Sequence, residues 1–261
     1  MAVAGSSTAS AATTYRGYPD SIAVLGHSGS TGEDSDPKQP HVEIRENSWA
    51  TGTNPEVRSV YGRILAKNPR IKGHNIALSQ GGATVQQVLL QAQQAMNMNP
   101  KPELILVQVI DNDIVCPAES SDYASFRSGV VAVLKELARA PASRVFLVSQ
   151  FGSPATYARS LTREQRQTLS GSGPCDFVDS TGNIVKAKAA RLDNVIHHYE
   201  AQLASACKHF ANCRYDGGAF GRVVDKPEYI TEDLNHFSVR GHAKAAAVAW
   251  AALKRAGLVP R

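Results

Sequence analysis

The sequence lacks the marks of several common protein classes. No apolar stretch reaches the ~20 residues that a membrane-spanning helix needs, and the longest one, Leu104 to Ile110, has the length of a strand. No CxxC pair and no Cys/His cluster with zinc-site spacing occurs, so a metal site is not expected. Both common phosphate-binding glycine patterns, GxxxxGK followed by Ser or Thr and GxGxxG, are also missing.

A strong charge of either sign is missing as well. The chain has 28 Lys and Arg against 23 Asp and Glu, which gives a net charge of only +5. The basic residues form no long run and are not interleaved with aromatic ones, so no nucleic-acid partner is predicted. With 43% hydrophobic and 20% charged residues, the composition is that of a soluble globular protein. The 261 residues fit one large α/β domain better than two small ones.

The two ends of the chain differ from the middle. Residues 2–13 are almost entirely small, without the basic and apolar regions of a signal peptide, and resemble the loose mature end of an exported protein. We therefore expect a flexible segment at 1–20 and a single domain at 21–257. Residues 258–261 match half of a thrombin site and are either a tag remnant or the native end.

Four cysteines, Cys116, Cys175, Cys207 and Cys213, allow three pairings. Cys207 and Cys213 flank a short segment that a small disulfide loop would explain, and Cys116 would then pair with Cys175. Two bridges would indicate an oxidising compartment. The alternative is four buried free thiols in a cytosolic protein.

Short apolar runs alternate with longer segments of helical periodicity. Strands are predicted at 22–25, 75–78, 104–110 and 144–149, and helices at 56–67, 84–98, 123–138, 184–207 and 239–256. Long polar connections are expected at 33–55 and 151–183. This alternation predicts a parallel sheet covered by helices on both faces. Because ligands bind outside the carboxyl ends of such strands, the residues that follow each strand are the candidate site.

Ser28 follows the first predicted strand in a loop of Gly, Ser and Thr. Acyl transfer needs an exposed hydroxyl beside a base, with backbone N–H groups aimed at the developing oxyanion. Asp233 and His236 lie three residues apart, which can place both on one side of a turn so that the carboxylate orients the imidazole. Alone, either signal is weak, since the loop could cradle phosphate and a DxxH pair is usually incidental.

Two further residues follow predicted strands. Asn112 ends the strongest strand and could donate its amide to an oxyanion, or simply form an Asx turn or helix cap. Gly82 begins the turn before the predicted helix at 84–98 and could offer its N–H, or be an ordinary turn glycine.

Taken in order, these segments resemble the conserved blocks of the SGNH hydrolases, also called GDSL-type esterases and lipases. The blocks are a serine block at Gly26 to Gly32, a glycine block at Asn75 to Thr84, an asparagine block at Ile110 to Asp113 and a late block at Asp233 to His236. The resemblance spans roughly Ser21 to Leu253. Segments 46–55 and 213–220 look like those of exported bacterial members, so a secreted or extracellular location in a bacterium is expected.

The resemblance implies a flavodoxin-like three-layer α/β/α sandwich with a central parallel sheet. It also implies that Ser28 attacks, that His236 acts as base and then as acid, and that Asp233 orients His236. The oxyanion hole would comprise the N–H groups of Ser28 and Gly82 and the side chain of Asn112. No metal or organic cofactor is implied.

The chain departs from the family pattern at three places. His27 replaces the aspartate usual before the serine, and Ile110 replaces the glycine usual two residues before the asparagine. The glycine block is doubled, so Gly81 is an alternative donor, although Gly82 in Gly-Ala-Thr is the better match.

The expected function is that of a serine esterase or lipase acting on carboxylic esters. A carbohydrate esterase that removes acetyl groups is the close alternative, and a non-catalytic binding module on the same fold is the alternative of another class. A phosphoesterase holding a metal between Asp111, Asp113 and His236 is a third. The expected partner is a small-molecule, lipid or polysaccharide ester, without nucleic acid or stable membrane insertion, and the protein is expected to be a monomer.

Overall fold

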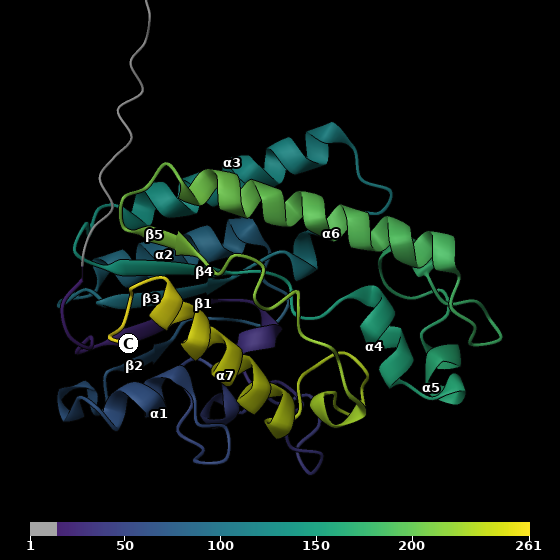
Figure 1. Ribbon diagram of the computed structural model, residues 1–261, viewed down its shortest axis with the longest axis horizontal. Helices are drawn as coiled ribbons and strands as arrows, with labels where there is room; N and C mark the ends of the chain where they lie inside the picture. Colours follow the sequence, from purple (N-terminus) through teal and green to yellow (C-terminus); the bar gives the residue numbers. More distant parts are fainter. Residues whose placement is uncertain (1–14) are drawn as a thin grey trace, which may run out of the picture.

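A computed structural model describes residues 15–261 (Figure 1). A sheet of five parallel strands, in the order β2-β1-β3-β4-β5, forms its centre. The strands are β1 (Ile22–Gly26), β2 (Asn75–Ala77), β3 (Leu104–Gln108), β4 (Arg144–Val148) and β5 (Cys213–Tyr215). Every residue of β1, β3 and β4 is buried, as expected for strands covered on both faces.

Helices cover both faces of the sheet, as Figure 1 shows. They are α1 (Val60–Leu65), α2 (Val85–Asn97), α3 (Ser120–Leu137), α4 (Pro154–Ser160), α5 (Arg163–Thr168), α6 (Lys186–Cys207) and α7 (Val239–Arg255). Helices α2, α3 and α6 pack in sequence on one face, and α1 and α7 contact each other on the other. Each face has its own apolar cluster. The predicted three-layer α/β/α fold is therefore confirmed.

Several elements differ from the sequence-based expectation. Helix α1 begins only at Val60, because Ser59 caps it by accepting a hydrogen bond from the Gly62 N–H. The connection at 151–183 contains α4 and α5, each started by a hydroxyl side chain, Ser153 and Thr162. Strand β5 was not predicted, because three residues are too few to show a period.

The packed structure extends beyond residues 21 and 257 at both ends. The Tyr15 hydroxyl donates to the Ser143 carbonyl at 3.3 Å, and the Arg144 guanidinium lies over the Tyr15 ring. At the other end Leu258 and Val259 are buried in the apolar cluster under α7. Residues 1–14, most of the segment expected to be flexible, lie outside the described part.

Both expected disulfides are present, Cys116–Cys175 and Cys207–Cys213. The first joins the segment after β3 to the 151–183 connection, and the second closes the turn between α6 and β5. In residues 15–261 no helix combines the length and the hydropathy required to cross a bilayer.

Candidate active site

A cavity of about 450 Å³ lies at the carboxyl ends of the strands, between the loop after β1, the 151–183 connection and the segment before α7. It is lined by Ser28, Asp233 and His236, which the sequence singled out separately. Its apolar wall comprises Ile114, Phe151, Leu169, Phe177, Leu192 and Ile196. The late block and the serine block thus line the same cavity, although they lie about two hundred residues apart in sequence.

The position of Ser28 follows from the end of β1. Gly26 has φ of +148°, and a Cβ there would lie 2.3 Å from the Gln108 carbonyl oxygen of β3, so only glycine fits. The chain then turns into a short 3₁₀ segment, Ser28–Ser30. His27 caps this turn, because its Nδ1 accepts the Gly29 N–H at 3.1 Å. The imidazole in place of the usual aspartate therefore has a local structural role.

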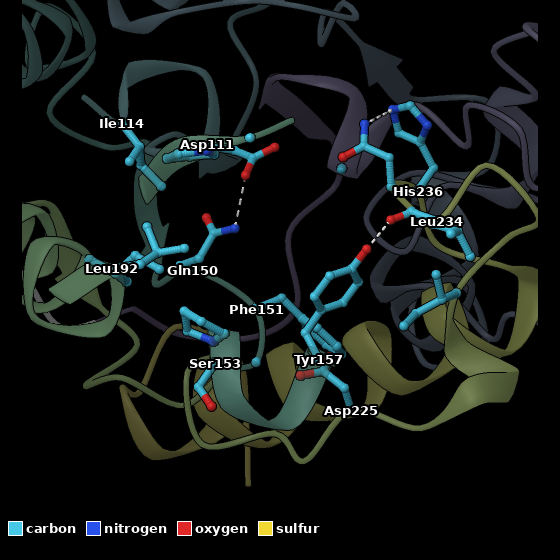
Figure 2. A pocket seen from close by; sticks show the side chains of 18 of the residues that line it. Asp111, Ile114, Gln150, Phe151, Ser153, Tyr157, Leu192, Asp225, Leu234 and His236 are labelled. Carbon is cyan, nitrogen blue, oxygen red and sulfur yellow. Dashed lines mark hydrogen bonds between the residues drawn. The ribbon is translucent and has the colours of Figure 1, made fainter. Parts of the chain in front are cut away.

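Asp233 and His236 are fixed within one turn. Asp233 Oδ1 accepts the backbone N–H groups of Asn235 and His236 at 2.9 and 3.1 Å, and its Oδ2 lies 2.5 Å from His236 Nδ1. Leu234 makes the turn possible by adopting φ of +59°. Its carbonyl accepts a hydrogen bond from the Tyr157 hydroxyl of α4, drawn in Figure 2. The imidazole is thus held with Nδ1 on the carboxylate and Nε2 available.

The charges around His236 favour its protonated form. Burial would lower the pKa of His236, but the hydrogen bond and charge of Asp233, with the charges of Glu33 and Asp34, raise it overall. Burial would likewise raise the pKa of Asp233, yet hydrogen bonds from His236 and Thr231 hold it well below its usual range. A carboxylate placed in this way stabilises a protonated imidazole.

Glu33 and Asp34 also lie beside His236, although no sequence pattern singles them out. Glu33 Oε2 lies 3.6 Å from His236 Nε2, and Asp34 Oδ2 lies 3.5 Å from His236 Nδ1. They belong to the polar connection expected at 33–55, for which the sequence indicated no site residue. Their place directly after the serine block was the one available signal, since residues so close to Ser28 cannot lie far from its base.

Ser28 and His236 share the cavity, but in residues 15–261 no hydrogen bond joins Ser28 Oγ to His236 Nε2. Nε2 instead lies 3.4 Å from Asn235 Nδ2 and faces Glu33. Such bonds are often long without substrate and tighten in the reacting complex. Forming the Ser28 contact requires a change in the position of one of the two side chains.

The two glycines of the glycine block have different partners. The Gly81 N–H donates to Glu43 Oε1 at 2.8 Å. The Gly82 N–H has no partner among residues 15–261, and Gly82 adopts φ of +73°, where glycine is favoured. Of these two glycines, Gly82 is therefore the one whose N–H is free to donate a hydrogen bond.

Asn112 is tied to the glycine block, because its Nδ2 donates to the Ala83 carbonyl at 3.2 Å. Asp113 strengthens the same link, since both of its carboxylate oxygens accept the Val85 N–H at the start of α2. Burial raises the pKa of Asp113 to about 6. Gly82 and Asn112 do not themselves line the cavity, unlike the other three site residues.

Ile110 adopts φ of +110°, a conformation that a β-branched residue rarely takes. The family's usual glycine at this position would take it without strain. The fully buried Ile110 side chain packs in the cluster beneath α2 and α3, which offsets this strain.

The metal-dependent alternative is not supported by the placement of its residues. Within residues 15–261, Asp111, Asp113 and His236 do not come together. In the described part of the chain, the one group of potential ligand atoms within 4.8 Å of one another is Glu33, Asp34 and His236. Its histidine is already held by Asp233 at 2.5 Å.

Comparison with known proteins shows the fold. The chain is similar to the solved structure of TesA, with a TM-score of 0.57 and 13% identity over 90% of this chain and 98% of that one. A catalytic mutant of Axe2, an acetylxylan esterase from Geobacillus stearothermophilus, matches with a TM-score of 0.51 and 14% identity, over 94% and 96%. LAE5, an alpha/beta hydrolase enzyme from the metagenome of Lake Arreo, matches at 0.50 and 16%, over 93% and 95%.

No protein-family model and no curated protein sequence matches the chain. At these identities the solved structures establish a shared fold and no more.

Proposed function

We propose that this protein is a serine hydrolase that cleaves carboxylic esters. The observation that carries the proposal is the joint lining of one cavity by Ser28, Asp233 and His236, with the aspartate 2.5 Å from the imidazole. A binding module would not need an oriented imidazole in the same cavity as a serine.

In the proposed reaction, His236 Nε2 takes the proton of Ser28 as Oγ attacks the ester carbonyl carbon. The oxyanion that forms is stabilised by the N–H groups of Ser28 and Gly82 and by the Asn112 amide. The imidazolium then protonates the leaving alcohol as the C–O bond breaks. Water, deprotonated by His236, hydrolyses the acyl-enzyme and restores Ser28. Asp233 holds the ring in the required tautomer throughout.

The closing of the oxyanion hole is part of the proposal. Gly82 has a free N–H and Asn112 is linked to Ala83, but both lie outside the lining of the empty cavity. We infer that substrate binding brings this side of the site inward. The acyl-enzyme route would then need both the Ser28, Asp233 and His236 side of the site and the Gly82 and Asn112 side.

Hydrolysis of p-nitrophenyl acetate, butyrate and octanoate by the native protein and by Ser28→Ala tests the proposal. We expect turnover that falls at least ~10³-fold in the variant, as for loss of a triad nucleophile. Ser30→Ala, which changes a buried serine two residues away, is the matched control. Covalent labelling by a fluorophosphonate should be lost only in Ser28→Ala, and retained activity in that variant would contradict the assignment.

An acetyl esterase acting on carbohydrate is the second candidate, supported by the fold shared with Axe2. The chain-length series separates the two. Activity confined to acetate would favour it, whereas equal or rising activity towards octanoate would favour a general esterase that uses the apolar wall of the cavity.

A further inference from the structure

Outside the Asp233–His236 pair, the charged groups that line the cavity are carboxylates. Although the chain has a net charge of +5, the part of it that the structure describes places no Lys or Arg in the cavity lining. The ionisable acids there are Asp111, Asp225 and Asp233. A substrate entering the cavity therefore meets carboxylates and apolar side chains.

Two of these three carboxylates are already occupied. Asp233 is paired with His236 at 2.5 Å. Asp225 accepts a hydrogen bond from the Thr156 hydroxyl at 2.5 Å at the start of α4. These two aspartates have evident roles in holding the late block and a helix end.

Asp111 differs from Asp233, which faces an imidazole, and from Asp225, whose carboxylate also accepts backbone hydrogen bonds. Its Oδ1 accepts a hydrogen bond from the neutral amide of Gln150 at 3.1 Å, its one side-chain partner among residues 15–261. The charge of Asp111 acts on His27, but the His27 Nδ1 already accepts the Gly29 N–H, and burial lowers the pKa of this imidazole and so disfavours its charged form. Asp111 thus presents an uncompensated negative charge to the cavity.

The place of Asp111 suits a contact with substrate. Figure 2 shows Asp111 and Gln150 pointing toward each other across the cavity from His236 and Leu234, with the apolar Ile114 and Leu192 alongside. A substrate spanning the cavity from the reacting centre would reach the Asp111–Gln150 pair next to an apolar wall.

We propose that Asp111, with Gln150, is a specificity-determining pair that accepts a hydrogen-bond-donating group of the substrate, ammonium or hydroxyl, and rejects a carboxylate. This inference rests on the proposed ester hydrolysis. It predicts that the site prefers neutral or cationic esters. A like charge placed beside a poorly compensated carboxylate costs enough to reduce binding by at least about tenfold.

Binding can be measured without turnover. We expect calorimetry to show that pentylammonium binds the native protein at least about tenfold more tightly than pentanoate, and that Asp111→Asn removes most of this difference. Pentanol separates the two donor groups, since affinity equal to that of pentylammonium would identify a hydroxyl as sufficient. Asp225→Asn is the matched control, a cavity carboxylate that already has a partner, and should keep the preference.

Kinetics locate the pair relative to the ester. The kcat/KM ratio of mono-p-nitrophenyl glutarate to p-nitrophenyl butyrate tests the acyl side. The ratio of butyrylthiocholine to its neutral 3,3-dimethylbutyl analogue tests the alcohol side. We expect Asp111→Asn to change one of these two ratios at least about fivefold relative to the native protein, and Asp225→Asn to change that ratio little. The ratio that changes shows on which side of the ester the pair lies.

Equal binding of pentylammonium and pentanoate, or a preference unchanged in Asp111→Asn, would overturn the inference. So would an equal effect of Asp225→Asn. A protein that showed the expected ligand preference but hydrolysed no ester would instead contradict the proposed function and leave the charge preference standing.

Discussion

Asp233 and His236 lie within one turn, whereas Gly82 and Asn112 belong to two connections that follow different strands. The first pair is fixed by hydrogen bonds that need no other element. The connections that carry the second pair are joined by the contacts of Asn112 with Ala83 and of Asp113 with Val85. Gly82 and Asn112 remain outside the cavity lining. The difference indicates that the proposed acid–base pair is formed in advance, while the proposed oxyanion hole depends on the relative position of two loops.

The largest effect expected within this comparison is that of Asp233→Asn. An amide at this position would favour the wrong imidazole tautomer, so we expect kcat to fall about 10⁴-fold. Steady-state hydrolysis of p-nitrophenyl butyrate measures it, with the exposed neighbour substitution Glu232→Gln as control. A fall smaller than about tenfold would mean that the Asp233–His236 contact does not orient the base.

Asn112→Ala tests the proposed oxyanion hole. Loss of one oxyanion donor costs about 10²–10³-fold in kcat, so we expect a fall in that range with little change in KM. Because Asn112 also holds Ala83, the thermal unfolding midpoint should be measured in parallel. A kcat within about threefold of the native value would show that the amide stays outside the reacting site.

The smallest expected effect is a pH shift in Glu33→Gln. Because the charge of Glu33 helps to raise the pKa of His236, its removal lowers that pKa. His236 must be neutral to act as base, so the rising limb of kcat/KM against pH should move to lower pH, by less than about one unit. The plateau at high pH should be retained, and Glu46→Gln, an exposed change in the same loop, should leave the limb in place. If the rising limb of Glu33→Gln also stayed in place, the charge of Glu33 would not contribute to the pKa of His236.

Much of this arrangement could be predicted from the sequence. Buried parallel strands such as Leu104–Gln108 are recognisable because nearly every residue is apolar. The order of the four blocks identified Ser28, Gly82, Asn112, Asp233 and His236 as candidates. The local DxxH spacing sufficed for the carboxylate–imidazole contact, because both groups lie on one turn.

The remainder depends on contacts between distant segments. Nothing periodic in the 33–55 loop indicates that Glu33 faces His236. The apolar wall combines Ile114, Phe177 and Leu192 from three separate segments, which no local pattern brings together. For the same reason the sequence could not show that Asp111, beside the expected asparagine, faces the cavity.

The Cys116–Cys175 bridge makes the shape of the cavity depend on oxidation. It joins the segment carrying Ile114 to the segment carrying Phe177, two parts of the apolar wall. The Asp233–His236 contact does not involve this bridge. Reduction would therefore loosen this wall while leaving the Asp233–His236 contact in place. On the proposed function, a reduced protein would discriminate less between substrates before it lost activity.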